Sequence, residues 1–511
     1  MGREDPDNVA DKNLRERPAP IELPAEYFRK LGHKVIDEIA EFLESLPSRP
    51  VTPHETPSTV RALLPNGSVP ESGMEPGALL DEAVRLLFDH SLFNGHPRFW
   101  GYISSSAAPI GALADLLAAT VNPNVGGWGP APVATEIEAQ TVRWIAELIG
   151  YPNDCGGILV SGGNMANFVG ILAARKAQAN WDVRKQGLWP AGGARLRLYA
   201  SEEAHTWIQK AADLFGFGTD AISWIRTDNH LCMDLDALRL RIRQDREGGS
   251  IPFVVVGTAG TVSTGAIDPL SELAAICHEE RLWFHVDGAY GALAAAVPNA
   301  PLALRGLREA DSVAIDPHKW LYAPLEAGCA LVRDSGHLRD AFSYHPPYYR
   351  LEEAEPVINY HEYGPQNSRG FRAFKVWLAL RQVGRSGYQQ MIADDMALAR
   401  TLVERVEAHP NLELGTHNLS ITTFRYAPSD LQKGTESAET FLNEINSALL
   451  MELQKSGEAY LSNAVVRGKF FLRACIVNFR TSVADVTVLP EMVARIGSEV
   501  DRRMRPTKLR D

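Results

Sequence analysis

A lysine, an aspartate and a glycine-rich turn each follow a short apolar run in this 511-residue sequence. Lys319 lies in the stretch Asp-Ser-Val-Ala-Ile-Asp-Pro-His-Lys-Trp-Leu at 311–321, where Val313–Ile315 predicts a buried strand that Pro317 ends. Burial disfavours an ammonium group, so a lysine at a strand end can offer the neutral amine that Schiff-base chemistry requires. Considered alone, Lys319 is more simply explained as a surface lysine.

Asp287 ends a second apolar run, Leu282–Val286, within the motif His-Val-Asp-Gly-Ala-Tyr-Gly. A carboxylate at the end of a buried strand is costly unless a cation or strong hydrogen-bond donors face it. The small residues Gly288 and Ala289 leave room for a flat ligand. A helix N-cap aspartate is the alternative, which explains the position of Asp287 but not its small neighbours.

The turn Ser161-Gly162-Gly163-Asn164 follows the apolar run Ile158–Val160 and precedes a predicted helix that begins at Met165. Glycines let the backbone approach a ligand, and the free N–H groups of a helix N-terminus favour a phosphate. The turn matches neither Gly-x-Gly-x-x-Gly nor a Walker loop, and a plain strand-to-helix turn explains it equally well.

Taken together, these three features are the contacts that pyridoxal 5′-phosphate (PLP) requires. A lysine bonds the cofactor, a carboxylate keeps its pyridinium nitrogen protonated so that the ring is an electron sink, and a helix terminus takes the phosphate. The sequence therefore predicts Lys319, Asp287 and the turn with Gly163 and Asn164 in one cofactor site.

Short apolar runs alternate with helix-length segments from residue 157 onward, a pattern that predicts an α/β domain with a mainly parallel sheet. In such a sheet, ligands bind beyond the carboxyl ends of the strands, where the residues above are expected. The predicted strands are Ile158–Val160, Leu196–Tyr199, Pro252–Val256, Leu282–Val286, Ser312–Ile315 and Ala330–Val332.

The rest of the chain suggests four regions. Residues 1–20 are charged and contain prolines, which predicts a disordered tail. An N-terminal helical segment is expected at 21–96, with an amphipathic helix over 24–46, then a large PLP-binding domain at 97–385 and a small α+β domain at 386–511. Helices are predicted at 371–382, 389–408 and 487–504, strands near 420–425 and 470–478, and a lid-like loop from Tyr344 to Gly364.

Charge and cysteine content exclude several other functions. The net charge of −12 argues against a nucleic-acid partner. The five cysteines are scattered and form no Cys-x-x-Cys pair, which favours reduced thiols in a cytoplasmic protein and no metal site. The most apolar stretches are interrupted by Asp115, Pro298 and Pro301, so no membrane span is expected.

The motifs Asp-Pro-His-Lys-Trp at 316–320 and His-Val-Asp-Gly-Ala-Tyr at 285–290 resemble those of the group II PLP-dependent amino acid decarboxylases, most closely the aromatic L-amino acid decarboxylases. The resemblance runs from about residue 24 to about residue 500. It implies a carboxy-lyase of amino acid metabolism with the aspartate-aminotransferase-like type I fold, working as a homodimer with sites at the subunit interface.

This resemblance also implies roles for individual residues. Lys319 is similar to the Schiff-base lysine, Asp287 to the pyridinium partner, and His205 to the histidine that stacks on the cofactor ring and contacts substrate. Further cofactor contacts are implied at Ala289, Gly163, Asn164, Thr261 and His318. Asp316 departs from the family, because animal aromatic decarboxylases have asparagine there, and an anion would repel the phosphate unless it is paired.

Tyr360 is expected to supply the catalytic proton. It aligns with a tyrosine on the family's mobile loop that protonates Cα after carbon dioxide leaves, with Tyr363 and Tyr348 as alternatives. Family members with phenylalanine at that position tend to be oxidative aldehyde synthases, so a tyrosine favours simple decarboxylation.

The substrate pocket is expected at Tyr102, Ile103 and Ser104, with Trp128 contributed by the partner subunit. Apart from Arg98, no basic residue near this segment could hold a second carboxylate, which argues against glutamate and aspartate and favours tryptophan, phenylalanine, tyrosine or Dopa. Histidine or 2,4-diaminobutyrate decarboxylation, oxidative aldehyde synthesis, and a non-catalytic dimeric binding protein are the alternatives.

Overall fold

Two regions of the chain, Met1–Leu92 and Phe93–Asp511, each make most of their contacts internally. The computed structural model describes residues 19–65, 67–188, 193, 195–344, 355–432 and 434–506. The tail predicted at 1–20 lies almost wholly outside the described residues, as does the middle of the predicted lid, residues 345–354. The four-region division above stays a prediction.

The N-terminal region is built on two amphipathic helices, α2 (Ala25–Ser45) and α4 (Pro76–His90), with the short helices η1 (Leu46–Ser48) and α3 (Pro57–Ala62) between them. Phe42 of α2 stacks on Phe88 of α4 with ring centroids 4.3 Å apart. Arg49 donates a hydrogen bond of 2.7 Å to the Phe88 carbonyl. The helix predicted over 24–46 is therefore present as α2.

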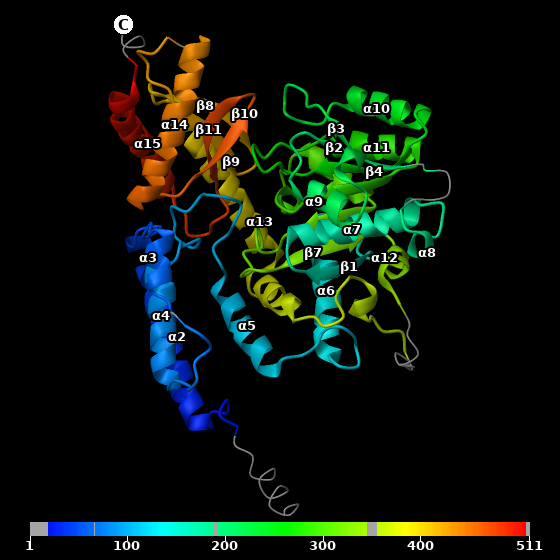
Figure 1. The fold of residues 1–511 in the computed structure, drawn as a ribbon, viewed down its shortest axis with the longest axis horizontal. Coiled ribbons are helices and arrows are strands. Elements are labelled where there is room, and N and C mark those ends of the chain that lie inside the picture. The colour runs from blue at the N-terminus through cyan, green and yellow to red at the C-terminus, as the bar shows by residue number, and fades with distance from the viewer. Residues whose placement is uncertain are drawn as a thin grey trace, which may run out of the picture. The chain divides into compact units, whose positions relative to one another are not determined.

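A seven-stranded sheet organises the second region, in the order β1-β7-β6-β5-β4-β2-β3. The labels β1, β7, β4, β2 and β3 mark this sheet in Figure 1. All neighbours are parallel except at β7, which runs antiparallel to β1 and β6. This confirms the predicted α/β class with a mainly parallel sheet. The strands are β1 (Gly156–Val160), β2 (Leu196–Ser201), β3 (Ile222–Ile225), β4 (Ile251–Thr258), β5 (Trp283–Asp287), β6 (Ser312–Ile315) and β7 (Gly328–Val332).

Alternate residues of these strands enter two separate apolar cores, because successive side chains of a strand point to opposite faces. On β1, Leu159 joins one core while Ile158 and Val160 join the other. Helices α6 (Pro132–Leu148), α10 (Leu235–Glu247) and α11 (Leu270–Glu280) cover the first face. The second face is covered by α7 (Gly163–Gln178), α9 (Trp207–Leu214) and α12 (Ser335–Phe342).

The two helices predicted at 371–382 and 389–408 are both present, as the two helical segments of α13 (Arg372–Glu407). Its kink lies at Gly384, where φ is 69°, a conformation that glycine adopts at little cost. Helix α5 (Pro109–Val121) packs against α13.

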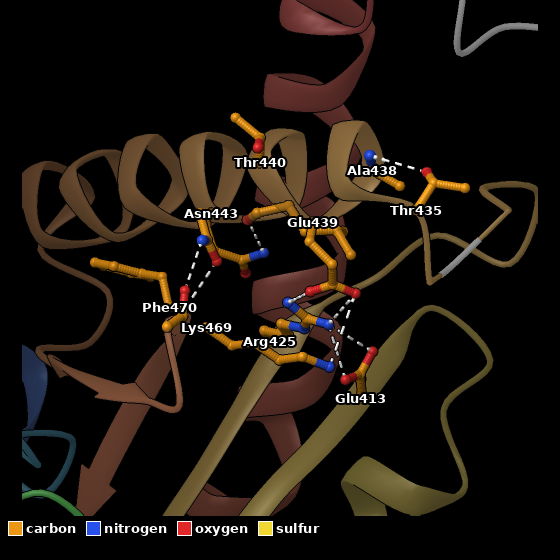
Figure 2. A network of polar contacts seen from close by, with 12 residues as sticks. Glu413, Arg425, Thr435, Ala438, Glu439, Thr440, Asn443, Lys469 and Phe470 are labelled. Atoms are coloured by element: carbon orange, nitrogen blue, oxygen red, sulfur yellow. Dashed lines mark hydrogen bonds and ion pairs between the residues drawn. The ribbon is translucent and has the colours of Figure 1, made fainter.

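A four-stranded antiparallel sheet, β10-β11-β9-β8, forms the C-terminal part together with α14 (Glu436–Ser456) and α15 (Val483–Met504). Its strands are β8 (Leu412–Asn418), β9 (Ile421–Tyr426), β10 (Ser462–Val466) and β11 (Lys469–Cys475). Figure 2 shows the fully buried Arg425 of β9 between Glu413 of β8 and Glu439 of α14, each at 2.9 Å. Because Arg425 pairs with both carboxylates, it ties α14 to β8 and β9.

Among the described residues, no helix is both long enough and apolar enough to cross a membrane.

Candidate active site

The carboxyl ends of β4, β5 and β6 lie side by side at the edge of the large sheet. Asp287, the last residue of β5, pairs in register with Thr258 of β4 and Ala314 of β6. A cavity of about 490 Å³ opens beyond these ends, a size typical of small-molecule sites. Its lining residues are Tyr102, Ile103, Ser104, Gly163, Asn164, Asn167, His205, Trp207, Thr258, Gly260, Val262, Asp287, Ala289, Tyr290, Asp316, His318, Lys319, Ser462, Asn463 and Arg473.

Lys319 follows β6 in a tight turn whose backbone is fixed on both sides. Its amide donates to the Asp316 carbonyl at 2.9 Å, and its carbonyl accepts from the Tyr322 amide at 3.1 Å. The ammonium group lies 2.9 Å from the Asp316 carboxylate, so the residue that the sequence left unexplained contacts the predicted Schiff-base lysine. An anion at 316 is therefore paired, as its burial requires.

Asp287 is held rigidly although it is nearly buried. One carboxylate oxygen accepts from the Trp207 indole N–H at 2.7 Å, and the other accepts from the Ala289 amide at 3.2 Å. A carboxylate can accept about four hydrogen bonds, so Asp287 retains capacity for a ligand. Trp207 is a site residue that the sequence reasoning missed.

His205 lies near Asp287, two residues before α9 begins at Trp207. Its Nδ1 accepts a hydrogen bond from the Trp207 amide at 3.3 Å, which places the proton of the neutral ring on Nε2. Burial lowers the pKa of His205, although Asp287 nearby acts in the opposite direction. The imidazole is therefore neutral near pH 7 and can present its flat face or its Nε2–H to a ligand.

The glycine-rich turn leads into α7 and leaves the N-terminus of this helix without a side-chain cap. Gly162 precedes α7 with φ of 90° and makes no side-chain cap, so the first amides of α7 have no intrahelical acceptor. A Cβ on Gly163 would lie 2.6 Å from the Asp316 carboxylate, which requires glycine there.

A buried hydrogen-bond network supports the first turn of α7. Asn167 donates to the Gly163 carbonyl at 2.9 Å and lies 2.7 Å from His285 Nε2, while His285 Nδ1 lies 2.7 Å from the Ser312 hydroxyl. Burial lowers the pKa of His285 to about 4. His285 is thus neutral and structural, and it does not line the cavity. It contacts Asn167, which does line the cavity and bonds to the Gly163 carbonyl.

Arg473 brings a buried positive charge from the small sheet. It donates to the carbonyls of Val262 and Tyr102 and to the Ser462 hydroxyl, and no carboxylate among the described residues forms an ion pair with it. A guanidinium carries five N–H groups, so two remain for a ligand. Burial lowers the pKa of Arg473. Nothing in the local sequence around residue 473 indicated this position.

The structure brings ten of the predicted site residues into this cavity: Tyr102, Ile103, Ser104, Gly163, Asn164, His205, Asp287, Ala289, His318 and Lys319. Three others do not line it. Thr261 is buried in its own turn, where its hydroxyl lies 2.9 Å from that of Thr264 and accepts from the Ala266 amide. Trp128 donates to Glu136 at 3.0 Å, outside the cavity of its own chain.

Tyr360 also lies elsewhere. It is 1% exposed and belongs to the core beneath α7 and α12, with the Arg369 guanidinium 4.8 Å above its ring. Tyr363 is buried beside it, and Tyr348 is outside the described residues. Its ring lines a second pocket with Val142, Cys155 and Ile358, and its role as the proton donor stays a prediction.

Comparison with known proteins decides the family. Residues 57–427 match the model of the pyridoxal-dependent decarboxylase conserved domain. The aromatic-L-amino-acid decarboxylase of Bacillus atrophaeus is 34% identical over 94% of this chain and 97% of its own length. This chain belongs to the pyridoxal-dependent decarboxylase family. The predicted family, the PLP cofactor and the class of carboxy-lyase are thereby confirmed.

Other relatives of this decarboxylase have different products. A phenylacetaldehyde synthase of a Rosa hybrid cultivar is 30% identical over 89% of this chain and 90% of its own. The structure of Oryza sativa TDC with PLP and tryptamine matches with a TM-score of 0.86 and 26% identity, covering 94% of this chain and 99% of that chain. The type I fold of the decarboxylases is therefore present here.

The residues that line the cavity fit PLP independently of the comparisons. The Thr258 hydroxyl is buried without a protein partner among the described residues and belongs to the cavity wall, as expected where a polar ligand binds. The donors of α7, the carboxylate of Asp287 and the amine of Lys319 match the phosphate, ring nitrogen and aldehyde of the cofactor.

Proposed function

We propose that this decarboxylase converts an aromatic L-amino acid to its amine and carbon dioxide, with Lys319 holding PLP and Asp287 facing the pyridinium nitrogen. The observation that carries the proposal is the convergence of Lys319, Asp287, His205 and the start of α7 on one cavity. PLP, when bound, withdraws the electrons of the bond that breaks at Cα.

The chain's own residues would bind and orient the reactants. Asp287, fixed by Trp207 and Ala289, would keep a proton on the ring nitrogen because a nearby carboxylate favours the cationic form. The amides of Gly163 and Asn164 would bind the phosphate. His205, being neutral, would pack flat over the ring and leave its Nε2–H for the substrate.

The two unused N–H groups of Arg473 would attract the carboxylate of the amino acid. A buried guanidinium without an anionic partner is costly, and a substrate carboxylate would compensate it. Arg98, which the sequence left as a possible carboxylate ligand, pairs instead with Asp485 at 3.1 Å and does not line the cavity. Arg473 is thus the arginine to test.

The aromatic side chain of the substrate is supported by two observations. Ile103, Val262, Tyr102 and Tyr290 give the cavity apolar and aromatic walls. The matched relatives include an aromatic-L-amino-acid decarboxylase and a tryptophan decarboxylase of Catharanthus roseus solved with L-tryptophan. A panel of L-amino acids that includes histidine and 2,4-diaminobutyrate, with peroxide and ammonia measured beside carbon dioxide, tests this against the alternatives.

One feature of the structure supports a homodimer. Leu113, Leu116, Leu117 and Val121 of α5 are 46–77% exposed and recur at helical spacing, so they form an uncovered apolar face. A partner copy covering this face would also bring its Trp128 turn toward the site, as the family resemblance implies. Cytoplasmic location stays a prediction; all five cysteines are free thiols.

Replacing Lys319 tests the whole assignment. Lys319→Ala should bind PLP without the visible absorbance of a lysine-bound cofactor and should lose at least about a thousandfold in kcat, because the amine that holds and releases the reactants is gone. Lys185→Ala, which removes an exposed lysine of α8 (Val183–Gln186), is the matched control. Retained turnover in Lys319→Ala would show that another residue holds the cofactor.

A further inference from the structure

Asp316 is a buried carboxylate with an unusual position, directly against the lysine that the cofactor needs. Its side chain is 3% exposed, that of Lys319 is 17% exposed, and the two charged groups are 2.9 Å apart. The second oxygen, Oδ1, has no hydrogen-bond partner within the described part of the chain. The carboxylate therefore depends on Lys319 for most of its stabilisation.

The other titratable groups around Asp316 cannot replace Lys319 as the ion-pair partner of its carboxylate. His318 Nε2 is 3.7 Å from Asp316 Oδ2, and burial lowers the pKa of His318 and also that of His205, which lies just before α9. Burial raises the pKa of the Cys329 thiol on β7, so this group is neutral as well. Of these groups, Lys319 makes the shortest contact with the Asp316 carboxylate.

We infer that Asp316 is a positioning residue that competes with the cofactor for Lys319. The inference rests on the proposed role of Lys319. When its nitrogen bonds the cofactor, Lys319 has to leave the carboxylate at least in part, and Asp316 then stays buried with a weaker partner. Cofactor retention is therefore lower than a neutral residue of the same shape at 316 would allow.

The position of Asp316 beside Gly163 also weakens cofactor binding. Asp316 Oδ2 is close enough to the start of α7 that a Cβ on Gly163 would meet it at 2.6 Å. The amides that would bind the phosphate are thus next to an anion, which opposes a second anion there. Both effects have the same sign, but they act on different parts of the cofactor, and an experiment can separate them.

The test compares cofactor release from the wild-type holoenzyme, Asp316→Asn and Asp287→Asn. Release is followed by trapping free PLP and recording the loss of bound-cofactor absorbance. Asp316→Asn should release PLP more slowly, by about tenfold or more, since a charge within a few ångströms of a partly buried group has effects of this size. Asp287→Asn should release it faster, because there the carboxylate assists binding. Opposite signs for two adjacent carboxylates are not expected from a general loss of packing.

Pyridoxal without phosphate distinguishes the two sources of the effect. If Asp316 competes for Lys319, Asp316→Asn also strengthens the binding of pyridoxal. A gain confined to PLP would place the effect on the phosphate and overturn the inference, as would equal or faster PLP release from a variant with unchanged circular dichroism. Asp316→Ser serves as the second variant if the asparagine protein is insoluble.

Borohydride reduction followed by peptide mass mapping keeps this inference separate from the proposed function. A cofactor label on Lys319 in both wild type and Asp316→Asn is expected. A label on another lysine would refute the assignment of Lys319 itself, whatever the release rates show.

Discussion

The position of the Tyr360 ring decides what its hydroxyl can do. It packs under the Arg369 guanidinium in the core, and burial raises its pKa well above the ordinary value. We predict that Tyr360→Phe still forms amine without added peroxide and loses about 1 kcal/mol of stability or less, the usual effect of one buried hydroxyl. Product analysis of Tyr360→Phe and its neighbour control Tyr363→Phe checks this.

Tyr348→Phe completes that comparison, because the family resemblance associates phenylalanine at the loop position with aldehyde synthesis. A switch to aldehyde, ammonia and peroxide in Tyr348→Phe alone would identify Tyr348 as the proton donor. The same switch in Tyr360→Phe would support the role that the family resemblance implies for Tyr360.

Residues that follow a buried strand were predictable from the apolar pattern, whereas His205 and the segment at 102–104 were expected only from the family resemblance. Asp287 and Lys319 could be found because an apolar run fixes where the strand ends, and ligands bind at such ends. Trp207, Asn167 and Arg473 reach the cavity from segments far away in the sequence, and their own neighbours carry no pattern of a site. Thr261 was expected at the cofactor from the family resemblance, and in this chain its hydroxyl lies 2.9 Å from that of Thr264.

Among the elements, α13 has a direct link to the Lys319 turn through Asp395. This carboxylate accepts from the Trp320 indole at 2.8 Å and the Tyr322 hydroxyl at 2.7 Å, and burial raises its pKa to about 7. Trp320 and Tyr322 lie one and three residues after the lysine in sequence. The link fixes the turn to α13 and thereby fixes the starting point of the Lys319 side chain.

We predict that Asp395→Ala lowers the stability by about 3 kcal/mol and speeds cofactor release, because two buried donors lose their acceptor. Asp394→Ala is a matched control, since Asp394 is exposed and bonds only to Gln390 among the described residues; its stability should change by about 0.5 kcal/mol or less. Thermal melts and release rates of both variants measure this. Equal behaviour of the two variants would mean that the turn needs no support from α13.

Most large-domain elements were predictable because parallel strands are continuous apolar runs between helices. β3 was missed: only four residues long, its run Ile222–Ile225 includes the exposed Trp224 and resembles a loop. α14 carries apolar residues at helical spacing, Phe441, Leu442, Ile445 and Leu449, and could have been predicted. Apolar and polar residues alternate only weakly along β8, so the position of this strand is fixed largely by its pairing with β9.

For the whole molecule, the apolar face of α5 predicts how two copies associate. Water contact with four large aliphatic side chains on one helix is unfavourable, and their burial by a second copy would stabilise a dimer by roughly 1 to 2 kcal/mol for each side chain. The opposite side of α5, with Gly111 and Ala114, is already buried. The exposed side is therefore available for association.

We predict that the double variant Leu116→Asp, Leu117→Asp shifts the protein from dimer to monomer and abolishes activity, because buried charges are costly and the partner's Trp128 turn is lost. Light scattering after size exclusion measures the mass, and PLP absorbance reports whether the fold persists. Leu240→Asp on α10, a leucine with the same exposure away from α5, should remain a fully active dimer. A dimeric double variant would exclude α5 from the interface, while an active monomer would show that one chain completes the site.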